Sequence, residues 1–157
     1  LAWSEKAMKL AERSEDPNCK LWLGTLYNNR GWGLFYLGRY EDAMALHAKC
    51  RAWHEERGNV EPALISTWAV GKCLRKLERY EEALAMQQEV LAEREKRELG
   101  TGFAHEEVAE NLLALGRAEE ATPHFVKAWE QLKELSWIDA DEPGRAARLR
   151  KLAGADD

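Results

Sequence analysis

Apolar residues recur three and four positions apart along most of the chain, which is the spacing of amphipathic α-helices. The pattern predicts three consecutive helix pairs, with residues 22–38 before 40–58, 63–78 before 80–100, and 102–116 before 118–135. Two more helices are predicted at the ends, over 1–14 and 142–154. No segment alternates as a half-buried strand does. We therefore predict an all-α fold of about eight antiparallel helices.

One short stretch is written three times. "LGRYEDAM" begins at Leu37, "LERYEEAL" at Leu77 and "LGRAEEAT" at Leu115, at intervals of 40 and 38 residues. Such a period indicates a repeat array. Small residues recur in register where two helices would approach closely, so we expect them to be buried. They are Gly31, Gly71 and Ala109 in the first helices, Ala43, Ala83 and Ala121 in the second, and then Cys50, Val90 and Ala128.

Glycines are placed where the predicted helices stop. Gly38 and Gly116 should end first helices in the left-handed conformation of a C-terminal cap, and Glu78 takes that place in the middle copy. Gly58 and Gly100 should end second helices. In the same register the chain ends read as half repeats, with Ala7 in the place of Cys50 and with Ala146 and Leu149 in the places of Gly31 and Leu34.

The small residues, followed by "G-x-Y-x-x-A", resemble the tetratricopeptide repeat, and "TLYNNRG" with "LAEREKRELG" resembles its longer subclass in kinesin light chains and bacterial regulatory proteins. The resemblance implies a right-handed α-α superhelix. It also implies one domain, 1–157, with these parts: a half repeat over 1–16, full repeats over 20–58, 60–100 and 101–138, and a capping helix over 142–154. Stacked neighbours would supply the core that one pair lacks.

Composition narrows the possible partners. Acidic and basic residues are intermixed and the net charge is −5, so no basic field is available for nucleic acid or an anionic membrane. No apolar run reaches the roughly 20 residues that cross a bilayer, and we expect a cytoplasmic protein. The three cysteines, Cys19, Cys50 and Cys73, suggest neither a disulfide framework nor a cysteine zinc site.

The family resemblance places a partner-binding groove along the first helices. It comprises Asn28, Asn29, Trp32, Phe35, Trp68, Lys72, Arg75, Lys76, Glu106 and Glu110, with Leu113 beside them. The "NN" pair matches a peptide-binding asparagine of related arrays, and an asparagine offers a donor and an acceptor to an extended ligand. We expect Trp32, Trp68, Lys72 and Lys76 to be exposed. The alternative is a solvated face without a ligand.

Other chemistry has weaker support. His47, Cys50 and His54 share a helix face and could begin a metal site, but Cys50 falls at a core position and a fourth ligand is missing. No phosphate loop, nucleophile elbow or zinc-protease pair is found, so we expect no enzymatic activity, cofactor or metal. Among the seven tryptophans, Trp53 and Trp129 are candidates for packing between helices.

The sequence thus predicts a non-enzymatic module that binds a protein or peptide as a scaffold or adaptor. Two alternatives stay open: a peptide-sensing regulatory domain of a larger transcription or signalling protein, and an enzyme accessory domain. The terminal half repeats could also pair two copies in a homodimer. The absence of an initiator Met before Leu1 suggests a fragment of a longer protein.

Overall fold

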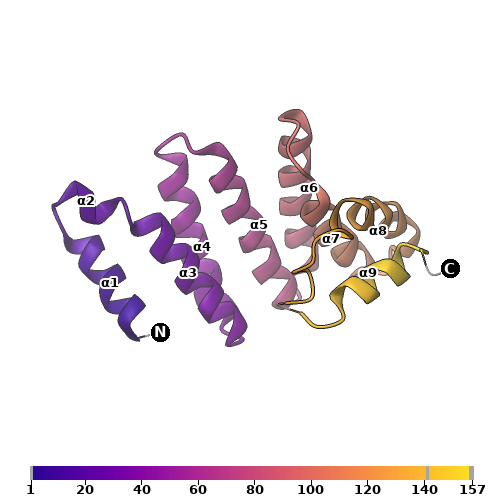
Figure 1. The fold of residues 1–157 in the computed structure, drawn as a ribbon, viewed down its shortest axis with the longest axis horizontal. Coiled ribbons are helices and arrows are strands. Elements are labelled where there is room, and N and C mark those ends of the chain that lie inside the picture. Colours follow the sequence, from indigo (N-terminus) through magenta and orange to yellow (C-terminus); the bar gives the residue numbers. More distant parts are fainter. Residues whose placement is uncertain (1, 141, 156–157) are drawn as a thin grey trace. The chain divides into compact units, whose positions relative to one another are not determined.

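The computed structural model describes residues 2–140 and 142–155, and every regular element in that part of the chain is an α-helix (Figure 1). This confirms the all-α prediction. The helices are α1 (Ala2–Arg13), α2 (Pro17–Lys20), α3 (Leu23–Tyr36), α4 (Tyr40–Glu55), α5 (Val60–Lys76), α6 (Tyr80–Lys96), α7 (Gly102–Ala114), α8 (Ala118–Leu132) and α9 (Arg145–Leu152). The single turn α2 was not predicted. It begins at Pro17 because the Asp16 side chain accepts a hydrogen bond from the Asn18 backbone N–H.

The chain divides into two compact units, residues 1–79 and 80–157. In the first unit α1 packs on α3, α3 on α4 and α4 on α5. In the second, α6 packs on α7, α7 on α8 and α8 on α9. Each unit therefore stacks its helices in sequence order, as a helical solenoid does. The boundary between the units lies inside the predicted repeat 60–100, whose limits stay a prediction.

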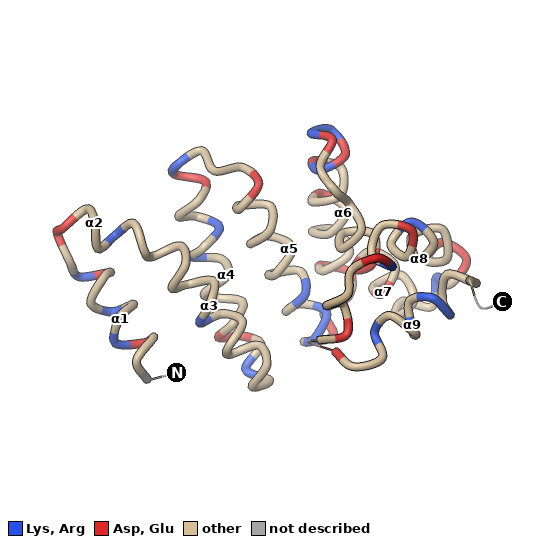
Figure 2. The backbone as a smooth tube through the Cα atoms, in the orientation of Figure 1, with Lys and Arg blue, Asp and Glu red and all other residues tan. Residues whose placement is uncertain are grey.

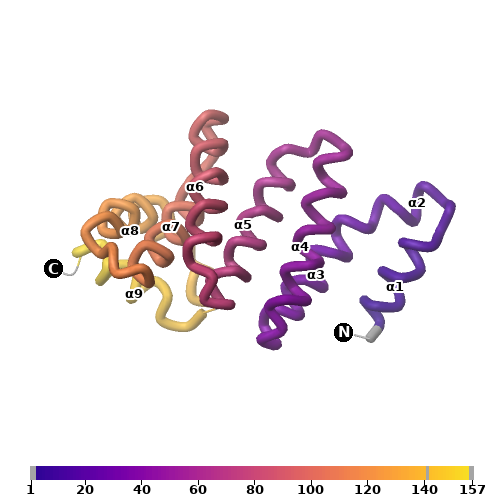
Figure 3. Tube along the Cα trace, turned by 180° about the vertical axis from the view of Figure 1, so that it is seen from behind, coloured from indigo at the N-terminus to yellow at the C-terminus, as the bar shows by residue number. Residues whose placement is uncertain are grey.

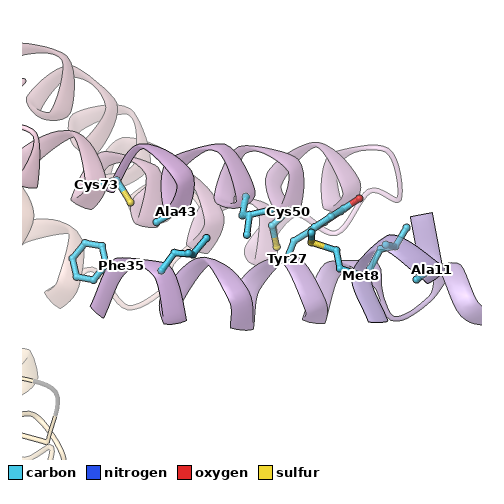
Figure 4. Packing of buried hydrophobic residues seen from close by; sticks show 10 residues of the cluster. Met8, Ala11, Tyr27, Phe35, Ala43, Cys50 and Cys73 are labelled. Carbon is cyan, nitrogen blue, oxygen red and sulfur yellow. The ribbon is translucent and has the colours of Figure 1, made fainter. Parts of the chain in front are cut away.

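Small residues let α3 and α4 lie close together in the first unit, and Figure 3 shows the two helices side by side. A methyl group added to Gly31 would lie 2.7 Å from Cε1 of His47, and one added to Gly24 would lie 2.8 Å from the Trp53 ring. Around this seam is a core of buried side chains, several of which Figure 4 shows between the helices. They include Met8, Ala11, Tyr27, Phe35, Ala43, Cys50 and Cys73.

The second unit has the same kind of core. Ala109, Ala121 and Ala128, predicted from the repeat register to be buried, are at most 1% exposed. Phe125 and Val108 fill the space beside them and are also buried. A methyl group on Gly102 would lie 2.9 Å from Cδ2 of Leu132, so this glycine sets the close approach of α7 to α8.

The predicted helix ends are mostly confirmed. Gly38 and Gly116 have φ values of 74° and 76°, and Glu78 takes the same left-handed conformation with φ 60°. The backbone N–H of the next residue, Arg79, donates to the Leu74 carbonyl at 3.0 Å. This bond satisfies a carbonyl of the last turn of α5.

The prediction for Gly100 is wrong. The left-handed residue after α6 is Glu98, with φ 55°, and the Leu99 backbone N–H donates to the Arg94 carbonyl at 2.9 Å. The α6 helix therefore ends two residues earlier than the glycine suggests, and Gly100 lies in the following loop.

Candidate partner-binding face on α3 and α5

Aromatic rings from two helices meet on one face of the first unit. Trp32 of α3 and Trp68 of α5 are both half-buried, and their ring centroids are 5.7 Å apart. Tyr36 follows Trp32 by one helical turn, with a centroid distance of 6.1 Å, and is 55% exposed. Phe35 supports Trp32 edge-on at 5.4 Å from within the core. We call the surface formed by Asn28, Asn29, Trp32, Tyr36, Trp68 and Lys76 the α3–α5 face.

Sequence spacing explains why three of the four side chains that α3 supplies to this face lie in a row. Asn28, Trp32 and Tyr36 are four residues apart, so they lie on successive turns of one side of the helix. The opposite side of α3 carries Leu23, Tyr27 and Leu34, which are buried. Packing against the core fixes the two tryptophan rings, and part of each ring stays accessible to solvent.

Lys72 differs from its prediction, because it is only 5% exposed. Its Nζ atom lies 5.3 Å from the Trp68 ring centroid and 5.8 Å from that of Phe35. The ammonium group thus faces two aromatic rings, an arrangement that the electron-rich ring faces favour. The expectation that Lys72 is an exposed groove residue is wrong, whereas Lys76 at the end of α5 is exposed.

Asn28 and Asn29 lie at the end of the α3–α5 face that is nearer the start of α3. Asn28 is half-buried, and its Nδ2 donates to Oδ1 of exposed Asn29 at 3.3 Å. Each amide has further donors and acceptors beyond this one bond. The pair can therefore offer both kinds of hydrogen-bonding group to an extended backbone.

His47 lies directly beneath Trp32. The two ring centroids are 4.9 Å apart, and His47 is fully buried. Neither ring nitrogen makes a hydrogen bond with the described residues. Burial lowers the pKa of His47 to about 4, so the imidazole is neutral near pH 7. Its role in the structure is to pack between Gly31 and Trp32.

The metal hypothesis for His47, Cys50 and His54 gains no geometric support. Cys50 is buried with its Sγ donating to the Gly24 carbonyl at 3.3 Å, and the His54 ring packs edge-on against Trp53. Within residues 2–140 and 142–155, no group of three or more His, Cys, Asp or Glu side chains is arranged to hold a metal ion.

Glu106 and Glu110 belong to the second unit, where α9 engages them. Arg145 donates to both carboxylate oxygens of Glu106 at 2.8 and 2.5 Å, and both side chains are 8% exposed. Arg148 pairs in the same way with Glu110, at 3.0 and 2.8 Å. Burial alone would lower the pKa of Arg145, but the bonds and charge of Glu106 raise it. These two glutamates therefore hold α9 against α7.

Several structural contacts were not anticipated from the sequence. His105 and His124 face each other across α7 and α8, with their Nδ1 atoms 2.8 Å apart. The Thr101 backbone N–H donates to Oε1 of Gln131 at 2.9 Å. These pairs are 19 and 30 residues apart in the sequence, so helical periodicity carries no signal for them.

The tetratricopeptide repeat family model matches two segments of the chain, residues 23–57 and 71–97. The first segment spans α3 and α4 with part of the turn that follows, and the second spans the end of α5 and all of α6. These matches support a tetratricopeptide repeat family. Repeats of this family generally mediate contacts between proteins. No curated protein and no solved structure matched the chain.

The repeat assignment agrees with the helix contacts of the first unit. Residues 23–57 contain the α3–α4 pair, in which the small residues Gly24 and Gly31 meet the second helix. The longer subclass that resembles kinesin light chains stays a prediction. No helix within the described ranges combines the length and the apolar character that crossing a membrane would require.

Proposed function

We propose that the protein is a non-enzymatic repeat module that binds a protein or peptide segment on the α3–α5 face and acts as a scaffold or adaptor. The observation that carries this proposal is the Trp32–Trp68 pair, in which two helices hold half-buried rings 5.7 Å apart. Tryptophan and tyrosine are the side chains most often found at the energetic centres of protein interfaces. Rings held by packing lose little conformational entropy on binding.

The chemistry of the α3–α5 face favours an extended segment with one apolar and one acidic side chain. Asn28 and Asn29 can bond its backbone, and Trp32, Tyr36 and Trp68 can take the apolar side chain. The end of α5 is basic, as Figure 2 shows, and exposed Lys76 would favour an acidic residue there. The proposed binding surface is smaller than the groove predicted from the sequence, because Glu106 and Glu110 already bind arginines of α9.

Selection of peptides from a random dodecamer library on the purified protein tests the proposal. The affinity of selected peptides is then measured by fluorescence polarisation for Asn29→Ala and Tyr36→Ser, whose side chains are exposed. We expect Tyr36→Ser to weaken binding about tenfold and Asn29→Ala less, consistent with the loss of interface contacts.

Trp137→Ser is the matched control, since Trp137 is 51% exposed and lies outside the α3–α5 face. Its affinity for the selected peptides should equal that of the unaltered protein. Peptides that bind Tyr36→Ser and Asn29→Ala as tightly as the unaltered protein would overturn the proposed face.

A further inference from the structure

The middle of α5 presents only apolar side chains to solvent. Between Ala63 and Leu74, a stretch that the structure describes in full, just three side chains stay accessible. They are Leu64 and Trp68, which are half-buried, and Ile65, which is 45% exposed. The accessible side of a surface helix is normally polar, so an apolar one is typical of a contact surface. We call Leu64 and Ile65 the α5 patch.

The α5 patch adjoins the α3–α5 face. Leu64 lies four residues and Ile65 three residues before Trp68, and residues at these spacings are neighbours on one side of a helix. The Trp68 ring in turn lies 5.7 Å from that of Trp32. A segment bound on the tryptophan pair is therefore within reach of the α5 patch.

The repeat fold does not require an apolar side chain at position 65. In the repeat register Ile65 corresponds to Thr25 of α3, which is exposed, and Trp68 corresponds to half-buried Asn28. The helix α3 thus forms the same kind of first helix with polar side chains at these two places. Packing within the fold therefore does not explain the apolar character of the α5 patch.

The second unit shows an apolar side chain bound at the same register position. Phe103 of α7 corresponds to Ile65, and the ring of Trp137 stacks on it with a centroid distance of 5.8 Å and an interplanar angle of 26°. Trp137 belongs to the turns between α8 and α9. A non-helical segment of the chain itself thus places an apolar side chain on the position that stays accessible in α5.

We propose that the α5 patch is a second apolar subsite beside the α3–α5 face, so that the ligand carries two apolar side chains. One contacts Trp32, Tyr36 and Trp68, as in the proposed function on which this inference rests, and the other covers the α5 patch. The second contact removes apolar surface of both partners from water, which favours binding. Ile65 thereby selects ligands with a large apolar residue at a second position.

Alanine substitution along a selected peptide, measured by fluorescence polarisation on the unaltered protein and on Ile65→Ser, tests this inference. On the unaltered protein, two apolar peptide positions should each lose about tenfold in affinity. On Ile65→Ser, one of these two losses should shrink to less than about twofold, because the partner side chain is already gone. The other loss should stay about tenfold on Ile65→Ser and shrink on Tyr36→Ser.

Val60→Ser is the matched control. Val60 is an aliphatic residue of the same helix and is 39% exposed, and its distance of five residues from Ile65 places it on another side of α5. Both peptide losses should stay about tenfold on this variant. Ile65 and Val60 are both exposed, so the fold should survive either change, which circular dichroism would verify.

Two outcomes would overturn the inference in different ways. If Tyr36→Ser weakens the selected peptides but both alanine losses persist in full on Ile65→Ser, the second subsite is wrong and the α3–α5 face stands. The same holds if the selected peptides depend on a single apolar position. If Tyr36→Ser and Asn29→Ala bind as tightly as the unaltered protein, the α3–α5 face is wrong and the second subsite falls with it.

Discussion

Lys72 is a charged residue held among aromatic rings, and its replacement tests that environment. Lys72→Glu would put a carboxylate against the electron-rich faces of Trp68 and Phe35 in a site that is 5% exposed. We expect the free energy of unfolding to fall by about 1–3 kcal/mol. The exposed neighbour Lys76 is the control, and Lys76→Glu should change the free energy of unfolding by less than about 0.5 kcal/mol. Urea denaturation measures both, and equal stabilities would show that Lys72 is solvated.

The low pKa values of two buried histidines, His47 and His105, imply that the free energy of unfolding falls in weak acid. Burial lowers the pKa of His47 to about 4, and burial together with the charge of His124 lowers that of His105 to about 4. The unfolded imidazoles keep a pKa near 6.5, so between about pH 4 and 6.5 the unfolded chain binds more protons. Stability should therefore be full above pH 6.5 and fall as the pH drops towards 4, by about 1–2 kcal/mol per histidine at pH 5.

His47→Gln isolates the contribution of one histidine, because Gln87 occupies the equivalent place in α6. Urea midpoints at pH 7 and pH 5 should differ less in this variant than in the unaltered protein. An unchanged difference would mean that His47 is not the buried neutral group described above.

At the scale of the helix, Gly31 allows α3 and α4 to approach. A methyl group there would lie 2.7 Å from Cε1 of buried His47, closer than van der Waals contact allows. Gly31→Ala should therefore lower the free energy of unfolding by about 1–3 kcal/mol, although alanine favours the helix. Gly100→Ala is the control, since nothing lies within 4 Å of its added methyl group. A rise in melting temperature for Gly31→Ala would contradict the packing of this seam.

The left-handed end of α5 predicts a stabilising change. Glu78 has φ 60°, where a side chain costs about 1–2 kcal/mol, whereas Gly38 and Gly116 fill the same place in the other copies. Glu78→Gly should raise the free energy of unfolding by about 0.5–1 kcal/mol, with part of the gain lost to the flexibility of the unfolded chain. Gly38→Glu should have the opposite effect. Thermal melts of both variants compare them, and destabilisation by Glu78→Gly would contradict this conformation.

Across the whole chain, the spacing of apolar residues predicted those features that depend on residues close together in the sequence. The long helices, the buried positions of Ala43, Cys50 and Ala128, and the left-handed ends of the first helices follow from helical spacing and repeat register. Burial of Lys72 and the pairing of Glu106 with Arg145 do not. They depend on which helix covers a polar side chain, and the ion pair joins residues 39 apart in the sequence. Periodicity predicts which face of a helix is buried, but it does not predict which other helix packs on that face.

The candidate site was predicted in part for the same reason. Asn28, Trp32 and Trp68 were chosen from helical spacing and family resemblance, and the structure brings the two tryptophans together. Glu106 and Glu110 shared that spacing, yet they pair with arginines of α9. The exposure of Ala7 on α1 could not be predicted, because Ala7 has the same repeat register as buried Cys50.

Hydrogen exchange of the protein with and without a selected peptide tests the α3–α5 face most directly. A ligand bound there should slow amide exchange in Leu23–Tyr36 and Val60–Lys76, the segments of α3 and α5, and leave Ala118–Leu132 of α8 unchanged. Protection confined to α8 or to the other helices of the second unit, with α3 and α5 unaffected, would contradict the account.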